Sequence, residues 1–264
     1  MKSIPRLFTL AVLALAFGFT SARATNIINA AFTSTGANQP LDGTTVGLSN
    51  NAPGGTWVFG AGVDYDVPKV NATWLGGILN AAGLGNENSA LGISISSSGG
   101  YVKPTEFTLT SDIYLWGNLN NVAGLGFWST MPARVNYSSP YVGFTGLILN
   151  EVNGTLQVYA SGSLQGGAVS VGTIVEDTPF TISYTVNTTS GEISGVTFGG
   201  NAVSGLSSTA FTDSATSFVG ALAGSSSRGS IDNLSVVSVP EPSTGALLLL
   251  SGLFFVNRRR ANRR

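Results

Sequence analysis

The stretch Glu106–Trp116, with the sequence EFTLTSDIYLW, decides the fold class of this chain. Apolar and polar side chains alternate along it, as they do in a strand with one face against a core. Phe107, Leu109, Ile113 and Leu115 share one face, and Thr108, Thr110, Asp112 and Tyr114 share the other. The alternation predicts a half-buried strand over the whole stretch.

A second alternating run, residues 180–186, is separated by a short polar segment from another strand candidate, Glu192–Phe198. That segment reads Asn-Thr-Thr-Ser-Gly, residue types that allow a chain to reverse direction. Two strands joined by such a segment predict a β-hairpin.

Short apolar runs separated by Gly, Asn and Ser continue through the rest of the chain. Together with the three above they give about twelve predicted strands, a pattern typical of an all-β sandwich or barrel. The further strands are predicted at residues 27–32, 56–59, 91–96, 125–128, 142–149, 156–160, 169–175, 217–223 and 230–237. Residues 72–84 have apolar side chains at helical spacing, but their glycines weaken a helix, and no element is predicted there.

Composition excludes several classes of function. The 264 residues include no Cys and no His, which excludes Cys-dependent and Ser-His-Asp catalysis and zinc sites built from Cys or His. Residues 25–239 carry four basic and twelve acidic side chains, a net charge of −8 that argues against a nucleic-acid partner. The length suits one β-sandwich domain, expected over residues 25–238.

The N-terminus has the layout of a secretory signal. Lys2 and Arg6 precede an apolar run at residues 7–19, and Ala22-Arg23-Ala24 forms a small-x-small cleavage site. Residues 1–24 are therefore predicted to be a signal peptide, handled by the secretion translocon and removed by signal peptidase. The alternative, an uncleaved anchor, would need roughly 20 apolar residues to cross a bilayer.

The C-terminus, residues 239–264, has three parts. Two prolines hold the first part extended, an uncharged apolar run at residues 245–256 follows, and arginines end the chain. The first part consists of Val239, Pro240, Glu241, Pro242, Ser243 and Thr244. The arginines are Arg258, Arg259, Arg260, Arg263 and Arg264, and are expected on the cytoplasmic side of a membrane.

This C-terminal segment resembles the PEP-CTERM sorting signal of Gram-negative bacteria that produce exopolysaccharide. The resemblance implies that an exosortase recognises the Pro-Glu-Pro motif and removes a hydrophobic helix that spans the membrane transiently. The protein would then lie at the outer cell surface or in the extracellular matrix. The apolar run of about 12 residues is short for a span, and an ordinary single-pass anchor is the alternative.

The body resembles the concanavalin A-like jelly rolls of secreted bacterial lectins and glucanases. The resemblance is carried by FTLT at 107–110, GLGFW at 124–128, GLILN at 146–150, the predicted hairpin at 180–193, and GSIDNLSV at 229–236. It implies a two-sheet antiparallel sandwich in which the last strand pairs near the first. Immunoglobulin-like and other jelly-roll folds are alternatives.

Candidate site residues are few. The Glu-x-Asp-x-x-Glu strand that the glucanase resemblance implies is absent, and Asp64 and Asp66 form a carboxylate pair without an evident partner. They could be a solvated turn, or could bind calcium with Asn118, Asn120 or Asn121 as further oxygen ligands. Tyr114 and Trp116, with Asn118 and Asn120 close by, could form a glycan site if their rings are exposed.

The sequence thus favours a non-enzymatic, exported protein with a structural or adhesive role and no required cofactor. A lectin-like module that binds extracellular polysaccharide is the alternative, and a degenerate glycoside hydrolase is a third hypothesis.

Overall fold

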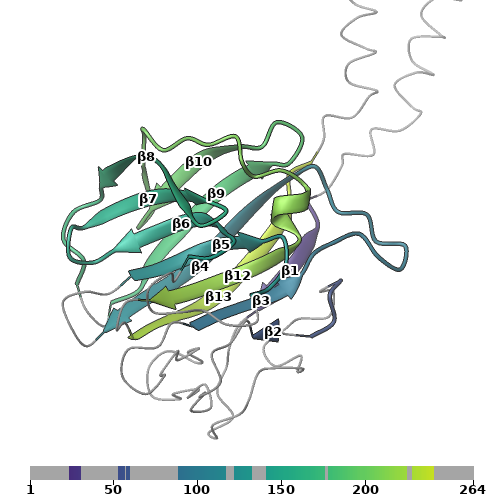
Figure 1. Ribbon diagram of the computed structural model, residues 1–264, viewed down its shortest axis with the longest axis horizontal. Helices are drawn as coiled ribbons and strands as arrows, with labels where there is room; N and C mark the ends of the chain where they lie inside the picture. The colour runs from purple at the N-terminus through teal and green to yellow at the C-terminus, as the bar shows by residue number, and fades with distance from the viewer. Residues whose placement is uncertain are drawn as a thin grey trace, which may run out of the picture. The chain divides into compact units, whose positions relative to one another are not determined.

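The stretch Glu106–Trp116 forms β4, an inner strand of one of two antiparallel sheets (Figure 1). The computed structural model describes residues 24–30, 53–56, 58–59, 89–116, 122–132, 141–175, 178–224 and 228–240. The described strands all belong to one compact unit, Asn26–Ser238.

One sheet has six described strands, in the order β1-β13-β4-β9-β10-β11. Besides β4, they are β1 (Asn26–Ala30), β13 (Arg228–Ser238), β9 (Phe180–Asn187), β10 (Glu192–Phe198) and β11 (Asn201–Ala202). The last strand, β13, pairs with the first, β1, and with β4. This closing pair agrees with the expectation drawn from the jelly-roll resemblance.

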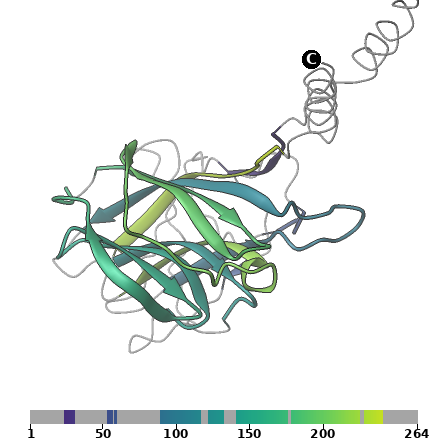
Figure 2. The ribbon, with the colours of Figure 1, turned by 90° about the horizontal axis from the view of Figure 1, so that it is seen from above.

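The other sheet has seven described strands, in the order β2-β3-β12-β5-β6-β7-β8. They are β2 (Val58–Phe59), β3 (Ser89–Ser94), β12 (Phe218–Gly224), β5 (Val122–Trp128), β6 (Phe144–Asn150), β7 (Thr155–Ala160) and β8 (Ser163–Ser170). A short 3-10 helix, η1 (Ser214–Thr216), precedes β12. The two sheets face each other as the layers of a sandwich (Figures 1 and 2).

The main core lies between the sheets and is centred on aromatic rings. Phe127 on β5 meets Phe107 on β4 and Tyr184 on β9 edge to face, with ring centroids 5.8 and 6.4 Å apart. Phe211 joins them from the segment before η1. The Tyr184 hydroxyl donates a hydrogen bond of 2.8 Å to the Leu125 carbonyl, so it is satisfied although fully buried.

Two strands of the six-stranded sheet contain bulges that keep apolar residues in the core. On β13, Ile231 and Leu234 both face the core although they are three residues apart, because an extra residue lies between Asp232 and Ser235. On β10, Ile193 and Val196 have the same spacing across another bulge. Each bulge contains a residue at positive φ: Asn233 at 51° and Gly195 at 59°.

The predicted sandwich and most predicted strands are confirmed, including the β9–β10 hairpin. The strand predicted at residues 169–175 is wrong in position, since β8 covers Ser163–Ser170. This edge strand is mostly exposed and contains two glycines, so it lacks the apolar run on which the prediction relied. Of the strand predicted at 56–59, Val58–Phe59 forms β2, Thr56 lies outside it, and residue 57 is not among the described residues.

The predicted signal peptide, apart from Ala24, lies outside the described residues. Residues 72–84 and the C-terminal segment after Pro240 lie outside them as well. In the part of the chain that the structure describes, no helix has both the length and the apolar character to cross a membrane. Strand β13 ends at Ser238, and Pro240 at the start of the predicted sorting motif is exposed.

Candidate functional site

A polar groove of about 650 Å³ opens beside the ends of β4, β9 and β10. Its volume lies within the range of small-molecule sites. Carboxylate, amide and hydroxyl side chains dominate its walls, which are lined by Glu106, Gln165, Asn187, Glu192, Ile193, Ser194, Ser207, Ser208 and Thr209.

Three of these residues form a row across neighbouring strands. Asn187 on β9 pairs in register with Glu106 on β4 and with Glu192 on β10. Their neighbours Phe107, Val186 and Ile193 are buried in the core, so the row faces away from it. Strands lie about 4.8 Å apart, which separates the two glutamate Cα atoms by roughly 10 Å with Asn187 between them.

The turn after β9 fixes Asn187. Its Oδ1 accepts hydrogen bonds of 3.0 Å from the backbone N–H groups of Thr189 and Ser190. The turn closes at Gly191, whose φ of 75° suits glycine and whose N–H donates to the Asn187 carbonyl. Because Oδ1 is occupied by the turn, the Asn187 side chain offers its Nδ2 hydrogens to the groove.

The facing wall comes from the segment between β11 and η1. Its hydroxyl residues 207–209 are followed by Phe211, whose ring is buried in the core and whose N–H donates to the Gly191 carbonyl at 3.0 Å. A Cβ atom on Gly191 would collide with the Thr209 carbonyl. The two walls therefore pack closely at Gly191.

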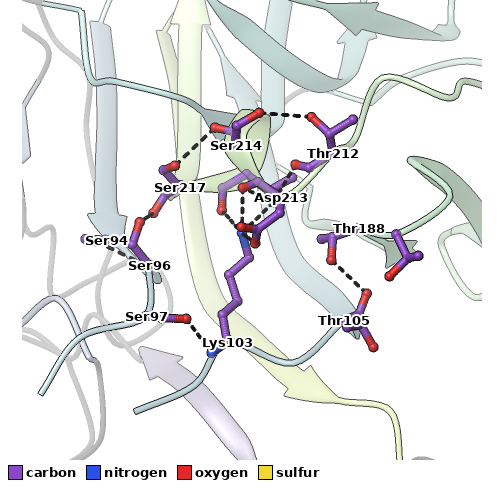
Figure 3. Close-up of polar contacts among 12 residues, drawn as sticks. Ser94, Ser96, Ser97, Lys103, Thr105, Thr188, Thr212, Asp213, Ser214 and Ser217 are labelled. Atoms are coloured by element: carbon purple, nitrogen blue, oxygen red, sulfur yellow. Dashed lines mark hydrogen bonds and ion pairs between the residues drawn. The ribbon is translucent and has the colours of Figure 1, made fainter. Parts of the chain in front are cut away.

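The same segment is held farther along by a buried lysine (Figure 3). The Lys103 side chain is 3 % exposed and forms an ion pair of 2.9 Å with Asp213. Its Nζ also donates to the Asp213 carbonyl at 2.9 Å, the Thr216 carbonyl at 2.9 Å and Thr216 Oγ1 at 2.7 Å. Burial lowers the pKa of Lys103 below its ordinary value, and Asp213 partly opposes that shift.

Tyr114, one of the predicted glycan-binding residues, lies on the outer face of β4 but is only 4 % exposed. Burial, and then the nearby Asp112 and Asp232 carboxylates, raise its pKa to about 12. A ring so deeply buried has little surface on which a sugar could stack. Near it, Asp112 accepts hydrogen bonds from Thr181 Oγ1 at 2.6 Å and from Asn233 Nδ2 at 2.9 Å.

The other predicted site residues lie outside what the structure describes. The Trp116 backbone belongs to β4, but its side chain is not described, and neither are Asn118 and Asn120. Asp64 and Asp66, the calcium candidates, also lie outside the described residues. Among described residues, no three Asp or Glu side chains gather as a metal site would require. The glycan and calcium assignments of the undescribed residues stay predictions.

The outer face of the seven-stranded sheet carries a feature that the sequence interpretation missed. Gly92, Gly220, Gly126 and Gly146 pair in register across β3, β12, β5 and β6, forming a row without side chains. The Phe144 ring lies against this row, since Cβ atoms on Gly126 and Gly146 would come within 2.8 and 2.6 Å of its Cζ. These glycines and Phe144 are buried, so the row serves packing and is not an open site.

Comparisons with known proteins agree with the fold. No protein-family model matches the chain, and no curated protein is similar to it in sequence. Peanut lectin with a 9mer peptide is similar in structure, with a TM-score of 0.51 and 10 % identity over 84 % of this chain and 100 % of the lectin. The described strands thus have a lectin-like jelly-roll arrangement, and the likeness is one of fold.

Two further solved structures are similar at lower scores. The carbohydrate recognition domain of Emp47p has a TM-score of 0.49 and 12 % identity over 84 % of this chain and 99 % of the domain. Carbohydrate-binding module CBM66 from Bacillus subtilis has a TM-score of 0.45 and 15 % identity over 69 % of this chain and 95 % of the module. Without a matching family model, the resemblance of the C-terminus to a sorting signal stays a prediction.

Proposed function

We propose that this protein is a non-enzymatic, exported β-sandwich that binds extracellular polysaccharide through the groove beside Glu106, Asn187 and Glu192. The groove itself carries the proposal, because its lining presents hydrogen-bonding groups to solvent from three adjacent strands and a facing segment. Such binding would give the protein an adhesive role in the matrix.

The chemistry of the lining suits sugar hydroxyl groups. The Glu106 and Glu192 carboxylates accept hydrogen bonds, Asn187 Nδ2 donates them, and the hydroxyls of residues 207–209 can do either. A sugar hydroxyl is also both donor and acceptor, so one sugar unit can satisfy several of these groups together. The fold is compatible with this function, since solved structures similar to it include a lectin and proteins named for carbohydrate recognition or binding.

The test is binding of the full secreted protein to a glycan array and to the matrix polysaccharide of its host. Glu106→Gln combined with Glu192→Gln should weaken binding at least tenfold, since each replaces a charged acceptor. Asn201→Ala is the matched control, because Asn201 is exposed on β11, beside the end of β10 that lies away from the groove. Binding that is lost in Trp116→Ala but kept in the double variant would place the site at Trp116. No binding to any polysaccharide would leave a purely structural role.

A glycoside hydrolase is the second candidate because Glu106 and Glu192 flank Asn187 in one row. Inverting hydrolases hold two carboxyl groups roughly 6.5–9.5 Å apart across the sugar. Release of reducing ends from a bound polysaccharide, abolished by Glu192→Gln, would establish this alternative. We expect binding without hydrolysis.

For the C-terminus we propose exosortase processing near Pro242, after export through the translocon and removal of residues 1–24. The motif begins directly after the last strand and its Pro240 is exposed, which leaves the segment accessible to a protease. Mass spectrometry of protein from its native host should find a mature C-terminus near Pro242. An intact Arg264 in the membrane fraction would instead indicate a permanent anchor.

A further inference from the structure

The Lys103 side chain is buried, and its Nζ ends in a cradle of oxygen atoms (Figure 3). Four oxygens lie within 2.7–2.9 Å of its Nζ: two backbone carbonyls, one hydroxyl and one carboxylate. An ammonium has three N–H donors, so at least one of them is shared between two oxygens.

Hydrogen bonds within the chain around η1 also hold part of the cradle. Thr216 Oγ1 donates within this turn, to the Thr212 carbonyl at 3.0 Å or the Asp213 carbonyl at 3.2 Å, which turns its lone pairs toward Nζ. The Thr216 N–H also bonds to the Thr212 and Asp213 carbonyls. Thr216 Oγ1 and the Asp213 carbonyl are thus held by bonds within the turn as well as by Nζ.

Oxygen atoms of this kind are also the ligands that a bound cation requires. Carbonyl oxygens that converge on one point replace the hydration shell of a monovalent cation. The Asp213 side chain is 80 % exposed, so the point can be reached from solvent once the lysine side chain is removed.

We propose that the turn around η1 is a monovalent-cation site, of ammonium or potassium type, that the protein fills with its own Lys103 ammonium. Lys103 reaches it from the loop between β3 and β4, where its N–H is held by Ser97 Oγ at 3.0 Å. The Lys103 ammonium, which is covalently part of the chain, thus takes the place that a free ion would occupy in the cradle. It positions the segment that runs from residues 207–209 of the groove through Phe211 to Thr216.

The experiment measures thermal unfolding of Lys103→Ala in ammonium chloride, potassium chloride and choline chloride at equal ionic strength. Ammonium or potassium should enter the vacated cradle, whereas choline is too large. Raising the ammonium concentration from its dissociation constant to tenfold above should raise Tm by about 2–4 °C relative to choline. The wild-type protein should show no difference among the three salts.

Lys103→Met is the matched control, because methionine has an unbranched side chain that takes up the space of the lysine stem but carries no charge. It should lose stability, since the Asp213 and Thr216 carbonyls each lose a hydrogen bond from Nζ, and it should not respond to ammonium. Equal Tm values for Lys103→Ala in all three salts, or the same response in Lys103→Met, would overturn the proposal. If Lys103→Ala does not fold in choline, recovery of folded protein in ammonium supports the site, and failure in both salts counts against it.

Discussion

At the scale of single residues, Tyr184 joins the two sheets. Its ring lies in the core on β9, and its hydroxyl donates to the Leu125 carbonyl on β5. Tyr184→Phe keeps the ring but removes the donor, so we expect a loss of about 1–2 kcal/mol in the free energy of unfolding. Urea denaturation measures it. Tyr159→Phe, which removes a hydroxyl from a half-buried ring, is the control, and an equal loss in both would show that the cross-sheet bond contributes nothing specific.

At Gly191 the cost of a positive φ can be separated from the cost of a steric clash, by comparison with Gly199. Both Gly191 and Gly199 have positive φ, of 75° and 56°, but a Cβ on Gly199 meets nothing while one on Gly191 meets the Thr209 carbonyl. Alanine should cost about 1–2 kcal/mol at Gly199 through φ alone. At Gly191 the added clash should raise the loss to on the order of 3 kcal/mol. Chemical denaturation of the two variants measures both losses in the free energy of unfolding. Similar losses would mean that the segment containing Thr209 moves aside without cost.

At the scale of elements, the bulge of β13 sets which residues face the core. Asn233 occupies it at φ 51° and donates from Nδ2 to Asp112. Asn233→Val places a β-branched residue at positive φ and should cost roughly 2–3 kcal/mol. Asn233→Gly loses the side-chain bond but suits the backbone, so about 1 kcal/mol or less is expected. Thermal unfolding ranks the two, and a more stable valine variant would contradict this account.

Strands with strict alternation could be predicted from the sequence, as β4 shows by its correct bounds and β9 by bounds correct to one residue. The bulges could not, because Ile231 and Leu234 break the spacing of two and only the partner strand β4 shows that both face inward. Edge strand β8 was misplaced because pairing with β7, rather than an apolar face of its own, defines it. Local pattern thus predicts strands, and tertiary pairing decides the exceptions.

The groove could not be predicted from the sequence either, because it too depends on the pairing of distant strands. Asn187 and Glu192 flank a turn that was correctly predicted, so their proximity within the hairpin could have been inferred. Glu106 joins them only because β4 pairs with β9, which no local pattern indicates. Lys103 and Thr216 likewise meet across more than a hundred residues of chain. Sites made by long-range pairing depend on which strands are neighbours. The sequence predicted a two-sheet sandwich but not the order of its strands.

At the scale of the whole molecule, the pH dependence of stability above neutral pH should be set by tyrosine. The chain has no histidine, so no side chain has an ordinary pKa between pH 5 and 8. Burial raises the pKa of Tyr101, Tyr114 and Tyr141 from 10.0 to about 12, and it raises the pKa of Tyr184 well above 10.0. These tyrosines therefore stay neutral in the folded protein at pH values where they would ionise in the unfolded chain.

The sign of the alkaline effect follows from proton binding. Above pH 10.0 the unfolded chain binds fewer protons than the folded protein at these tyrosines, so stability should fall as pH rises through the interval from 10.0 to about 12. Lys103 acts oppositely, because its lowered pKa makes stability rise toward pH 10.5, but it is one group against four. Denaturant unfolding at successive pH values should show a plateau through neutral pH and a decline above 10.0. The decline should be shallower in Tyr114→Phe, and an unchanged slope in that variant would mean that Tyr114 ionises as freely in the fold as outside it.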